Sequence, residues 1–356
     1  MCKELNVDTK YTINNSTLYT IDNNTFIISN PTSRKLLSYP EIIGVEIPHL
    51  LEAPIADFLQ YSINPLQKEK INIVNILRGG LNFPIEDACQ SINYPVESVS
   101  FLTSERVFLD KRVSRIESKY RKIIPLNMST IIIGDIIASG ETLINTIHYL
   151  MEQFILDSKC FKKILVFTIG TTNTLKAIHQ LNQEILDRWP SFEGITAIFF
   201  EGIFTTYPNE GMTRLNLPHV DFFIKKGIIA PEFREEMINS NSLIFEKCSI
   251  YDGGARRFEQ HDHIKCILAY WENLHKLSDC IDVRLFLNEK FGHDSDISFD
   301  EWLKINNYKC SENNFMHDLF IREINFYSHI INYGFGNITK ERLNYLKNYY
   351  SFYLTE

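Results

Sequence analysis

The stretch Ile131-Ile132-Ile133-Gly134-Asp135-Ile136-Ile137-Ala138-Ser139-Gly140-Glu141-Thr142-Leu143 decides the fold that this sequence predicts. It opens with an apolar, β-branched run of strand length, which predicts a buried strand. The carboxylate of Asp135 follows at the end of the run, and the small residues 138–140 then lead into helical spacing that continues to about Leu156. A strand that passes through a tight turn into a helix is the building unit of parallel α/β sheets.

The same rhythm extends on both sides of this stretch. Strands are expected at 71–77, 96–102, 130–134, 164–169 and 195–200, and helices at 85–92, 140–156 and 173–186. Continuous apolar strands that alternate with helices indicate a parallel sheet covered on both faces, here over about residues 65–205. Ligands of such sheets bind beyond the carboxyl ends of the strands, so the loops after Leu77, Leu102, Ile133 and Ile169 are the places to look for a site.

The chain on either side of this region has a different character. Residues 1–64 are rich in Asn and Thr and predict one or two short strands and a helix near 50–61, as a flank or hood of the core. An α/β domain is expected at 65–234 and an all-α domain at 235–356. Four helices are expected in that last part, at 261–277, 283–291, 315–333 and 340–353. Their aromatic stripes predict core or dimer contacts.

Composition excludes several classes of protein. The 356 residues carry a formal net charge of −8, which argues against a large duplex-DNA surface, because such surfaces neutralise phosphates with Lys and Arg. The seven cysteines are scattered without a CxxC pair, which argues against a zinc ribbon or a disulfide framework. No stretch of about 18 apolar residues and no apolar signal core is present, so we expect a cytoplasmic protein that does not span a membrane.

The turn after Asp135 has the chemistry of a phosphate site. Small residues let backbone N–H groups converge, the helix N-terminus adds positive partial charge, and Ser139 and Thr142 add hydroxyl donors. A carboxylate beside such a cradle can accept hydrogen bonds from the vicinal hydroxyls of a sugar. Together these groups predict a ribose 5-phosphate site. The plainer alternative is a strand that ends in a solvated Asp, followed by a helix capped by Ser139.

Residues 131–143 resemble the phosphoribosyl-pyrophosphate (PRPP) signature of type I phosphoribosyltransferases. That signature is an apolar run, two acidic residues, two apolar residues and a small turn of the Ala/Thr-Ser/Thr-Gly-Gly-Thr kind. Two positions depart from it: Gly134 replaces the first acid, and Glu141 replaces the second Gly of the turn. The resemblance implies a parallel-sheet, type I phosphoribosyltransferase-like α/β core, followed here by an all-α C-terminal domain.

A second segment, Arg78-Gly79-Gly80, follows the first core strand. Two glycines let the backbone approach an anion closely, while the guanidinium can bind it through two hydrogen bonds. The segment resembles the pyrophosphate-binding loop of the same family and precedes the PRPP-like segment in the order that the family requires. Taken alone, Arg-Gly-Gly is more often a turn with a solvated Arg.

A third segment is rich in cations. Residues 105–122 hold seven Lys or Arg against three Asp or Glu, in a chain that is acidic as a whole. The plain interpretation is a solvated hairpin. The functional one is a lid that closes over pyrophosphate and excludes water, and the segment resembles the flexible catalytic loop of type I enzymes. The lid candidates are Ser104, Arg106, Arg112, Arg115, Lys119 and Tyr120.

The resemblance implies an enzyme, a PRPP-dependent pentosyltransferase that moves the 5-phosphoribosyl group to a small, nitrogen-heterocyclic acceptor and releases pyrophosphate. It implies Mg²⁺ held mainly by PRPP, with Asp135 reached through water and no direct protein ligand. The PRPP-binding residues would be Arg78, Gly79, Gly80, Asp135, Ala138, Ser139, Gly140, Glu141 and Thr142, and the catalytic ones Asp135, Arg78, Arg106 and Lys119. Phe204 and Tyr207 are candidates for stacking on the acceptor. Members of the family are commonly dimers, so a homodimer is expected.

Other functions remain open at this stage. The chain could be a regulator that binds PRPP or a nucleotide and has lost turnover, although a regulator needs no cation-rich lid. The C-terminal region could use the phosphoribosyl product in a second step. Tyr251–Phe258 predicts a turn before a helix, with the alternative that it reaches the active site. His261-Asp262-His263 has no third metal ligand at a suitable spacing, so Asp262 is expected to complement a helix dipole.

Overall fold

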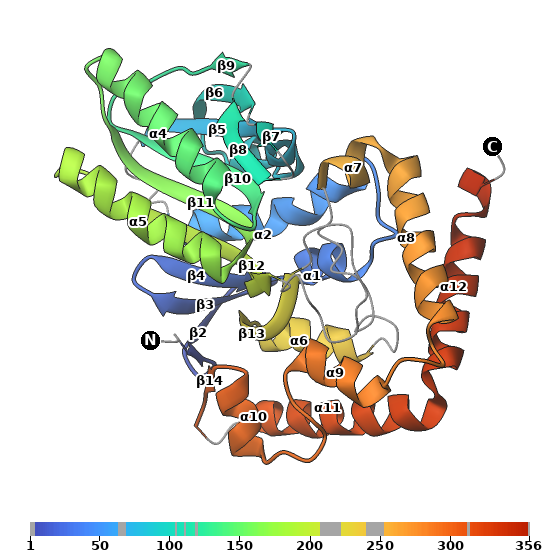
Figure 1. Ribbon diagram of the computed structural model, residues 1–356. Coiled ribbons are helices and arrows are strands. Elements are labelled where there is room, and N and C mark those ends of the chain that lie inside the picture. The colour runs from blue at the N-terminus through green and yellow to red at the C-terminus, as the bar shows by residue number, and fades with distance from the viewer. Residues whose placement is uncertain are drawn as a thin grey trace. The chain divides into compact units, whose positions relative to one another are not determined.

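The computed structural model describes residues 4–62, 69–103, 105–109, 112–117, 120–206, 222–239, 253–311 and 314–354 (Figure 1). Its internal contacts divide the chain into two compact units. The sheet unit comprises residues 11–33 and 48–203, and the helical unit comprises residues 1–10, 34–47 and 204–356. The sequence places boundaries at 64/65 and 234/235, whereas the sheet unit ends at residue 203. It also takes in part of the N-terminal segment, because residues 25–28 pair with residues 197–200.

The sheet unit is built on a mostly parallel sheet of the predicted α/β class. Its strand order is β2-β3-β4-β12-β11-β10-β5-β6-β9. The pairs β4/β12, β11/β10, β10/β5 and β5/β6 are parallel, and the pairs β3/β4 and β6/β9 near the edges are antiparallel. The strands are β2 (Lys10–Ile13), β3 (Ser16–Asp22), β4 (Thr25–Ser29), β5 (Ile71–Leu77), β6 (Val96–Thr103), β9 (Arg121–Lys122), β10 (Ser129–Ile137), β11 (Phe161–Thr171) and β12 (Ile195–Thr206).

Five elements connect these strands: α2 (Glu46–Ser62), η1 (Gly79–Asn82), α3 (Ile85–Ser91), α4 (Glu141–Leu156) and α5 (Thr172–Arg188). The chain passes from β10 through α4 to β11, and from β5 through η1 and α3 to β6 on the other side. The two connections therefore leave the adjacent strands β10 and β5 in opposite directions. Such a reversal is the topological switch point at which open α/β sheets bind ligands.

The apolar strand runs are buried on both faces of the sheet. Ile131, Ile132 and Ile133 of β10 are all fully buried, as a continuous apolar run predicts. Gly134 faces Phe83 and pairs in register with Phe167 of β11, and Phe167 packs on Phe58 of α2. Because side chains alternate along a strand, the next register pair, Asp135 and Thr168, points to the opposite face.

The helical unit contains the helices that the sequence predicts for the C-terminal part. The four predicted helices are α8 (Gln260–Lys276), α9 (Val283–Phe291), α11 (Asn314–Tyr333) and α12 (Phe335–Tyr349). The unit also contains α6 (Pro231–Asn239), α7 (Gly253–Phe258), α10 (Phe299–Ile305) and η3 (Ser351–Leu354), which the sequence did not predict. The unit also has strands that the sequence did not predict: β1 (Leu5–Asn6) pairs with β14 (Tyr308–Lys309), and β13 (Phe222–Ile229) belongs to the same unit. Within the described part of residues 235–356, where an all-α domain is expected, β14 is the one strand and the other elements are helical. No helix in the described ranges is both long and apolar enough to span a bilayer.

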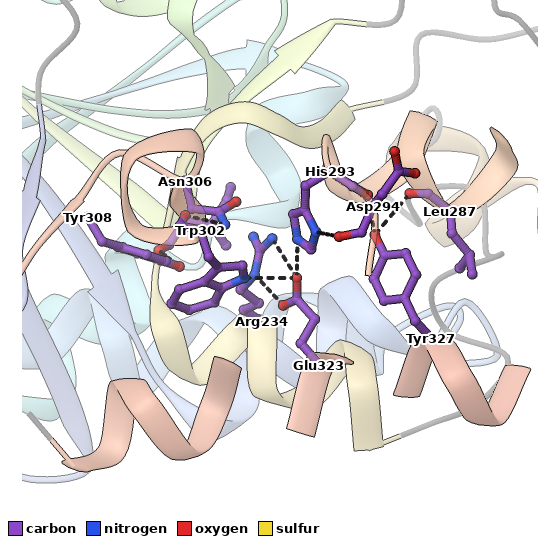
Figure 2. A network of polar contacts seen from close by, with 10 residues as sticks. Arg234, Leu287, His293, Asp294, Trp302, Asn306, Tyr308, Glu323 and Tyr327 are labelled. Carbon is purple, nitrogen blue, oxygen red and sulfur yellow. Dashed lines mark hydrogen bonds and ion pairs between the residues drawn. The ribbon is translucent and has the colours of Figure 1, made fainter. Parts of the chain in front are cut away.

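A buried network of polar side chains lies at the centre of the helical unit (Figure 2). Arg234 of α6 donates to both carboxylate oxygens of Glu323 of α11, at 2.6 and 3.1 Å. The Nε1 of Trp302 donates to Glu323 Oε1 at 3.1 Å, and the Nε2 of His293 lies 2.6 Å from the same oxygen. The Nδ1 of His293 lies 2.9 Å from the carbonyl oxygen of Asp294.

The network holds Glu323 as a carboxylate. Burial by itself would raise the pKa of Glu323, but the charge of Arg234 and the hydrogen bonds from His293 and Arg234 lower that pKa to about 2. Arg234 and Glu323 are 1% and 0% exposed. A buried ion pair is stable only when its remaining hydrogen-bonding capacity is met, which is the arrangement here.

Another buried cation, Arg256 of α7, closes the end of α1 (Pro31–Ser38) within the helical unit. Its guanidinium donates to the carbonyl oxygens of Leu36, Tyr39 and Ile42 at 2.6–2.9 Å. The last carbonyls of a helix have no partner within the helix, so a cation placed there is favourable. The sequence predicts a turn before a helix at 251–258. In the structure, residues 253–258 of this segment form the helix α7. Residues 251 and 252 lie outside the described residues.

Candidate functional site

Asp135 lies near the carboxyl end of β10, at the switch point of the sheet. The residue is 8% exposed, and its Oδ1 accepts a hydrogen bond of 2.9 Å from the backbone N–H of Ile136. Burial raises the pKa of Asp135 to about 7, and that one backbone hydrogen bond only partly opposes the rise. A carboxyl that is buried with so little compensation is a candidate for function.

The turn after Asp135 has the form that the sequence predicts. Gly140 has φ +86° and precedes α4, and a Cβ added to it would lie 2.5 Å from the Cβ of Ala177. The carbonyl oxygen of Ala138 accepts a hydrogen bond from the hydroxyl of Thr171, which fixes the turn to the end of β11. Ser139 and Glu141 are exposed, and Thr142 is half-buried. The first N–H groups of a 16-residue helix therefore lie beside the end of the strand that carries Asp135.

The predicted anion loop lies against the end of β10 at Gly134 and Asp135. Arg78 is exposed and caps η1, and the peptide bond before it is cis. A Cβ added at Gly79 would overlap Oδ1 of Asp135, and one added at Gly80 would lie 3.2 Å from the carbonyl oxygen of Gly134. The structure thus brings together two segments that are about 55 residues apart in the chain. Only glycine allows the loop to approach the carboxylate so closely.

The missing first acid of the signature has a structural explanation. A side chain at Gly134 would overlap the Cβ and ring of Phe83. Phe83 belongs to a buried aromatic group: its ring centroid lies 6.1 Å from that of Phe200, which in turn lies 6.3 Å from that of Phe167. Packing against this group therefore excludes a second carboxylate, and Asp135 is the one acid at this end of β10.

The cation-rich segment is a hairpin. Strands β7 (Glu105–Leu109) and β8 (Arg112–Glu117) pair antiparallel and form a two-stranded sheet of their own. Tyr120 is 49% exposed, and its N–H donates to the Thr103 hydroxyl at the base of the hairpin. The backbone places Arg106, Arg112 and Arg115 on the hairpin, while Ser104 and Lys119 lie outside the described residues.

The two acceptor candidates are not brought to this site by the described structure. Phe204 is 1% exposed and packs against Phe222 and Phe233, at centroid distances of 6.1 and 5.9 Å. It is therefore a core residue of the helical unit, and its ring offers no open face for a heterocycle. The stacking prediction for Phe204 is not supported, because its ring is buried among other aromatic rings. Tyr207 lies outside the described residues.

Of the two histidines at 261 and 263, His263 is buried and has a structural contact. The Nε2 of His263 lies 3.0 Å from the carbonyl oxygen of Pro40 in the same unit. Within the described ranges, no group of three or more His, Cys, Asp or Glu is placed to hold a metal ion. Any divalent cation at Asp135 would therefore need most of its ligands from a bound substrate.

Sequence reasoning missed one polar residue in this region. Asn82 closes the η1 turn, is 2% exposed, and its amide has no hydrogen-bond partner among the residues that the structure describes. No motif pointed to it, because a single Asn beside two glycines is typical of any turn.

Comparison with known proteins gives a fold likeness and no sequence match. No protein-family model matches the chain, and no curated protein does. Among solved structures, a hypoxanthine phosphoribosyltransferase from Staphylococcus aureus is similar, with 15% identity and a TM-score of 0.30, over 45% of this chain and 77% of that one. The Trypanosoma cruzi hypoxanthine phosphoribosyltransferase is similar at 15% identity and a TM-score of 0.25, over 49% of this chain and 76% of that one. At these values the likeness assigns neither an activity nor an acceptor.

Proposed function

We propose that the chain is a PRPP-dependent phosphoribosyltransferase that acts on a small nitrogen-heterocyclic acceptor. One observation carries the proposal: the buried carboxylate of Asp135 lies against the Gly79 backbone, at the end of the strand that leads into the turn before α4. This arrangement combines an acceptor for sugar hydroxyls with two glycine turns that can bind phosphate. The sequence resemblance at 131–143 and 78–80 supports the same assignment.

Each part of PRPP has a place in the proposal. The N-terminal N–H groups of α4 and the hydroxyls of Ser139 and Thr142 would bind the 5-phosphate. Asp135 would accept hydrogen bonds from the ribose hydroxyls. A carboxylate is the better acceptor, so binding should strengthen as Asp135 ionises above about pH 7. Arg78 and the backbone of Gly79 and Gly80 would bind the pyrophosphate group.

In this proposal, Mg²⁺ would bind together with PRPP, which would supply most of its ligands. Asp135 is the one carboxylate at the end of β10, because Phe83 excludes an acid at Gly134. One carboxylate is too few oxygen ligands for Mg²⁺, so pyrophosphate, ribose and water would supply the others, with Asp135 reached through water. When bound, the ion would neutralise charge on the pyrophosphate as it leaves.

The chemistry would be displacement at the anomeric carbon. The bond from that carbon to the pyrophosphate oxygen breaks, the acceptor nitrogen forms the new bond, and pyrophosphate leaves with the electron pair. Arg78 and the cations of the β7–β8 hairpin, including Arg106, would stabilise the negative charge that develops on it, with Lys119 as a further candidate. Closure of the hairpin would exclude water from the electron-poor carbon.

A pyrophosphate-release screen tests the proposal. The full chain is mixed with PRPP, Mg²⁺ and one heterocycle at a time, with Asp135→Asn as the matched inactive control. The proposal expects release that depends on one acceptor class and falls at least 100-fold in the variant. PRPP binding without release for any acceptor would favour the regulator instead, and the absence of binding would overturn both functions.

A further inference from the structure

The amide of Asn82 is a buried polar group whose hydrogen bonds are not made within the described structure. Asn82 is 2% exposed, and neither its Oδ1 nor its Nδ2 has a hydrogen-bond partner among the described residues. An Asn side chain can make up to four hydrogen bonds, and burial without any of them is costly. Native proteins keep such groups rarely, and a binding or catalytic role is one reason for keeping them.

A second buried Asn in the same unit shows the ordinary arrangement. Asn72 of β5 is 0% exposed, and its Nδ2 donates to the carbonyl oxygen of Ile124 at 2.9 Å. Its Oδ1 accepts from the Ser100 hydroxyl at 3.2 Å. The fold thus satisfies a buried amide at one end of the β5 region and leaves another unsatisfied just beyond the carboxyl end of that strand.

The position of Asn82 connects it with the proposed site. Asn82 and Gly79 are the last and first residues of η1, three positions apart. Side chains three residues apart in a 3₁₀-helix point in the same direction. The Cα of Gly79 faces the carboxylate of Asp135, so Asn82 lies on the side of the turn that faces the end of β10.

We propose that Asn82 is a binding residue for the diphosphate group of the substrate, an inference that rests on the proposed function. Its Nδ2 donates to a diphosphate oxygen when the η1 turn shifts to admit the ligand. The chemistry favours the diphosphate, because Asn82 shares its turn with Arg78, Gly79 and Gly80, and because an amide N–H complements a phosphate oxygen. Binding then replaces an unsatisfied amide by a partnered one.

The test compares Asn82→Leu with Asn72→Leu, since Leu is close to Asn in shape and lacks its polar atoms. For each full-length protein, the melting temperature without ligand and the dissociation constants for PRPP with Mg²⁺ and for pyrophosphate with Mg²⁺ are measured. The expectation for Asn82→Leu is an unchanged or higher melting temperature and at least tenfold weaker binding of both ligands. Asn72→Leu should melt at a lower temperature and bind within about twofold of the wild type.

The outcomes separate the inference from the function on which it rests. Equal binding by wild type and Asn82→Leu overturns the role of Asn82 and leaves the function standing. A loss of melting temperature in Asn82→Leu as large as that in Asn72→Leu shows that the amide is satisfied in the fold, and also overturns the inference. A wild type that binds neither ligand overturns both. Asn82→Ala, which adds no bulk, gives the same comparison if the Leu variant does not fold.

Discussion

Two buried acids, one in each unit, have opposite surroundings. Glu323 in the helical unit accepts hydrogen bonds from Arg234, His293 and Trp302, and its pKa is lowered to about 2. Asp135 in the sheet unit accepts a hydrogen bond from the neighbouring backbone N–H of Ile136, and burial raises its pKa to about 7. Glu323 is satisfied by side chains of its own core. Asp135 has hydrogen-bonding capacity left that a ligand could use. The comparison distinguishes a structural acid, Glu323, from a candidate functional acid, Asp135.

The largest effect should follow from removing the structural acid. Glu323→Gln takes away the charge opposite Arg234 in a site that water does not reach, so we expect a loss of about 3–5 kcal/mol in the free energy of unfolding. The control is Glu235→Gln, because Glu235 pairs with Arg322 at the same 2.6 Å but at 30% and 41% exposure. That variant should change stability by less than about 1 kcal/mol, and equal losses in denaturant titrations would contradict the distinction.

The turn beside Asp135 should tolerate little change. Gly140→Ala places a side chain at φ +86° and 2.5 Å from the Cβ of Ala177, so we expect a loss of about 1–3 kcal/mol in stability. Gly336→Ala in α12 is the control, since its Cβ would lie 3.4 Å from the Ser278 hydroxyl, an ordinary contact. That variant should be neutral or gain up to about 1 kcal/mol. A Gly140→Ala protein as stable as the wild type would show that the turn is not fixed as described.

The contribution of Asp135 to stability should change with pH in the opposite sense to that of Glu323. The folded chain favours the neutral form of Asp135, so its contribution to stability is complete below about pH 3.8 and is lost as the pH rises through about 7. Asp135→Asn should therefore gain about 1 kcal/mol or more at pH 8 relative to pH 4, both measured against the wild type. The contribution of Glu323 is present above pH 4.5 and is lost as the pH falls toward 2. Parallel pH profiles for the two acids in thermal unfolding would contradict the comparison.

The sequence predicted the core strands and the C-terminal helices well, because their patterns are local. The run Ile71–Leu77 is β5 residue for residue, and Val283–Phe291 is α9. The pairing of β4 with β12 could not be predicted from the sequence, because it joins residues about 170 positions apart and no local pattern indicates it. The helical unit also contains β13 and the β1/β14 pair, which are too short or too mixed in pattern to separate from loops.

In the candidate site, too, the residues in local motifs could be predicted and those that depend on distant contacts could not. Asp135, Gly79 and Gly140 were predicted from their motifs, and the structure brings Asp135 and Gly79 into contact. The aromatic cluster around Phe204 and the unsatisfied amide of Asn82 depend on three-dimensional surroundings that a turn or a strand pattern does not encode.

The most direct test of the account is a calorimetric titration of PRPP with Mg²⁺ at pH 8, for the wild type and for Asp135→Asn. The account predicts saturable binding to the wild type and at least tenfold weaker binding to the variant, although the variant is at least as stable. Equal affinity in both proteins, or a wild type that does not bind, would contradict the assignment of Asp135 as the acid that holds the ribose.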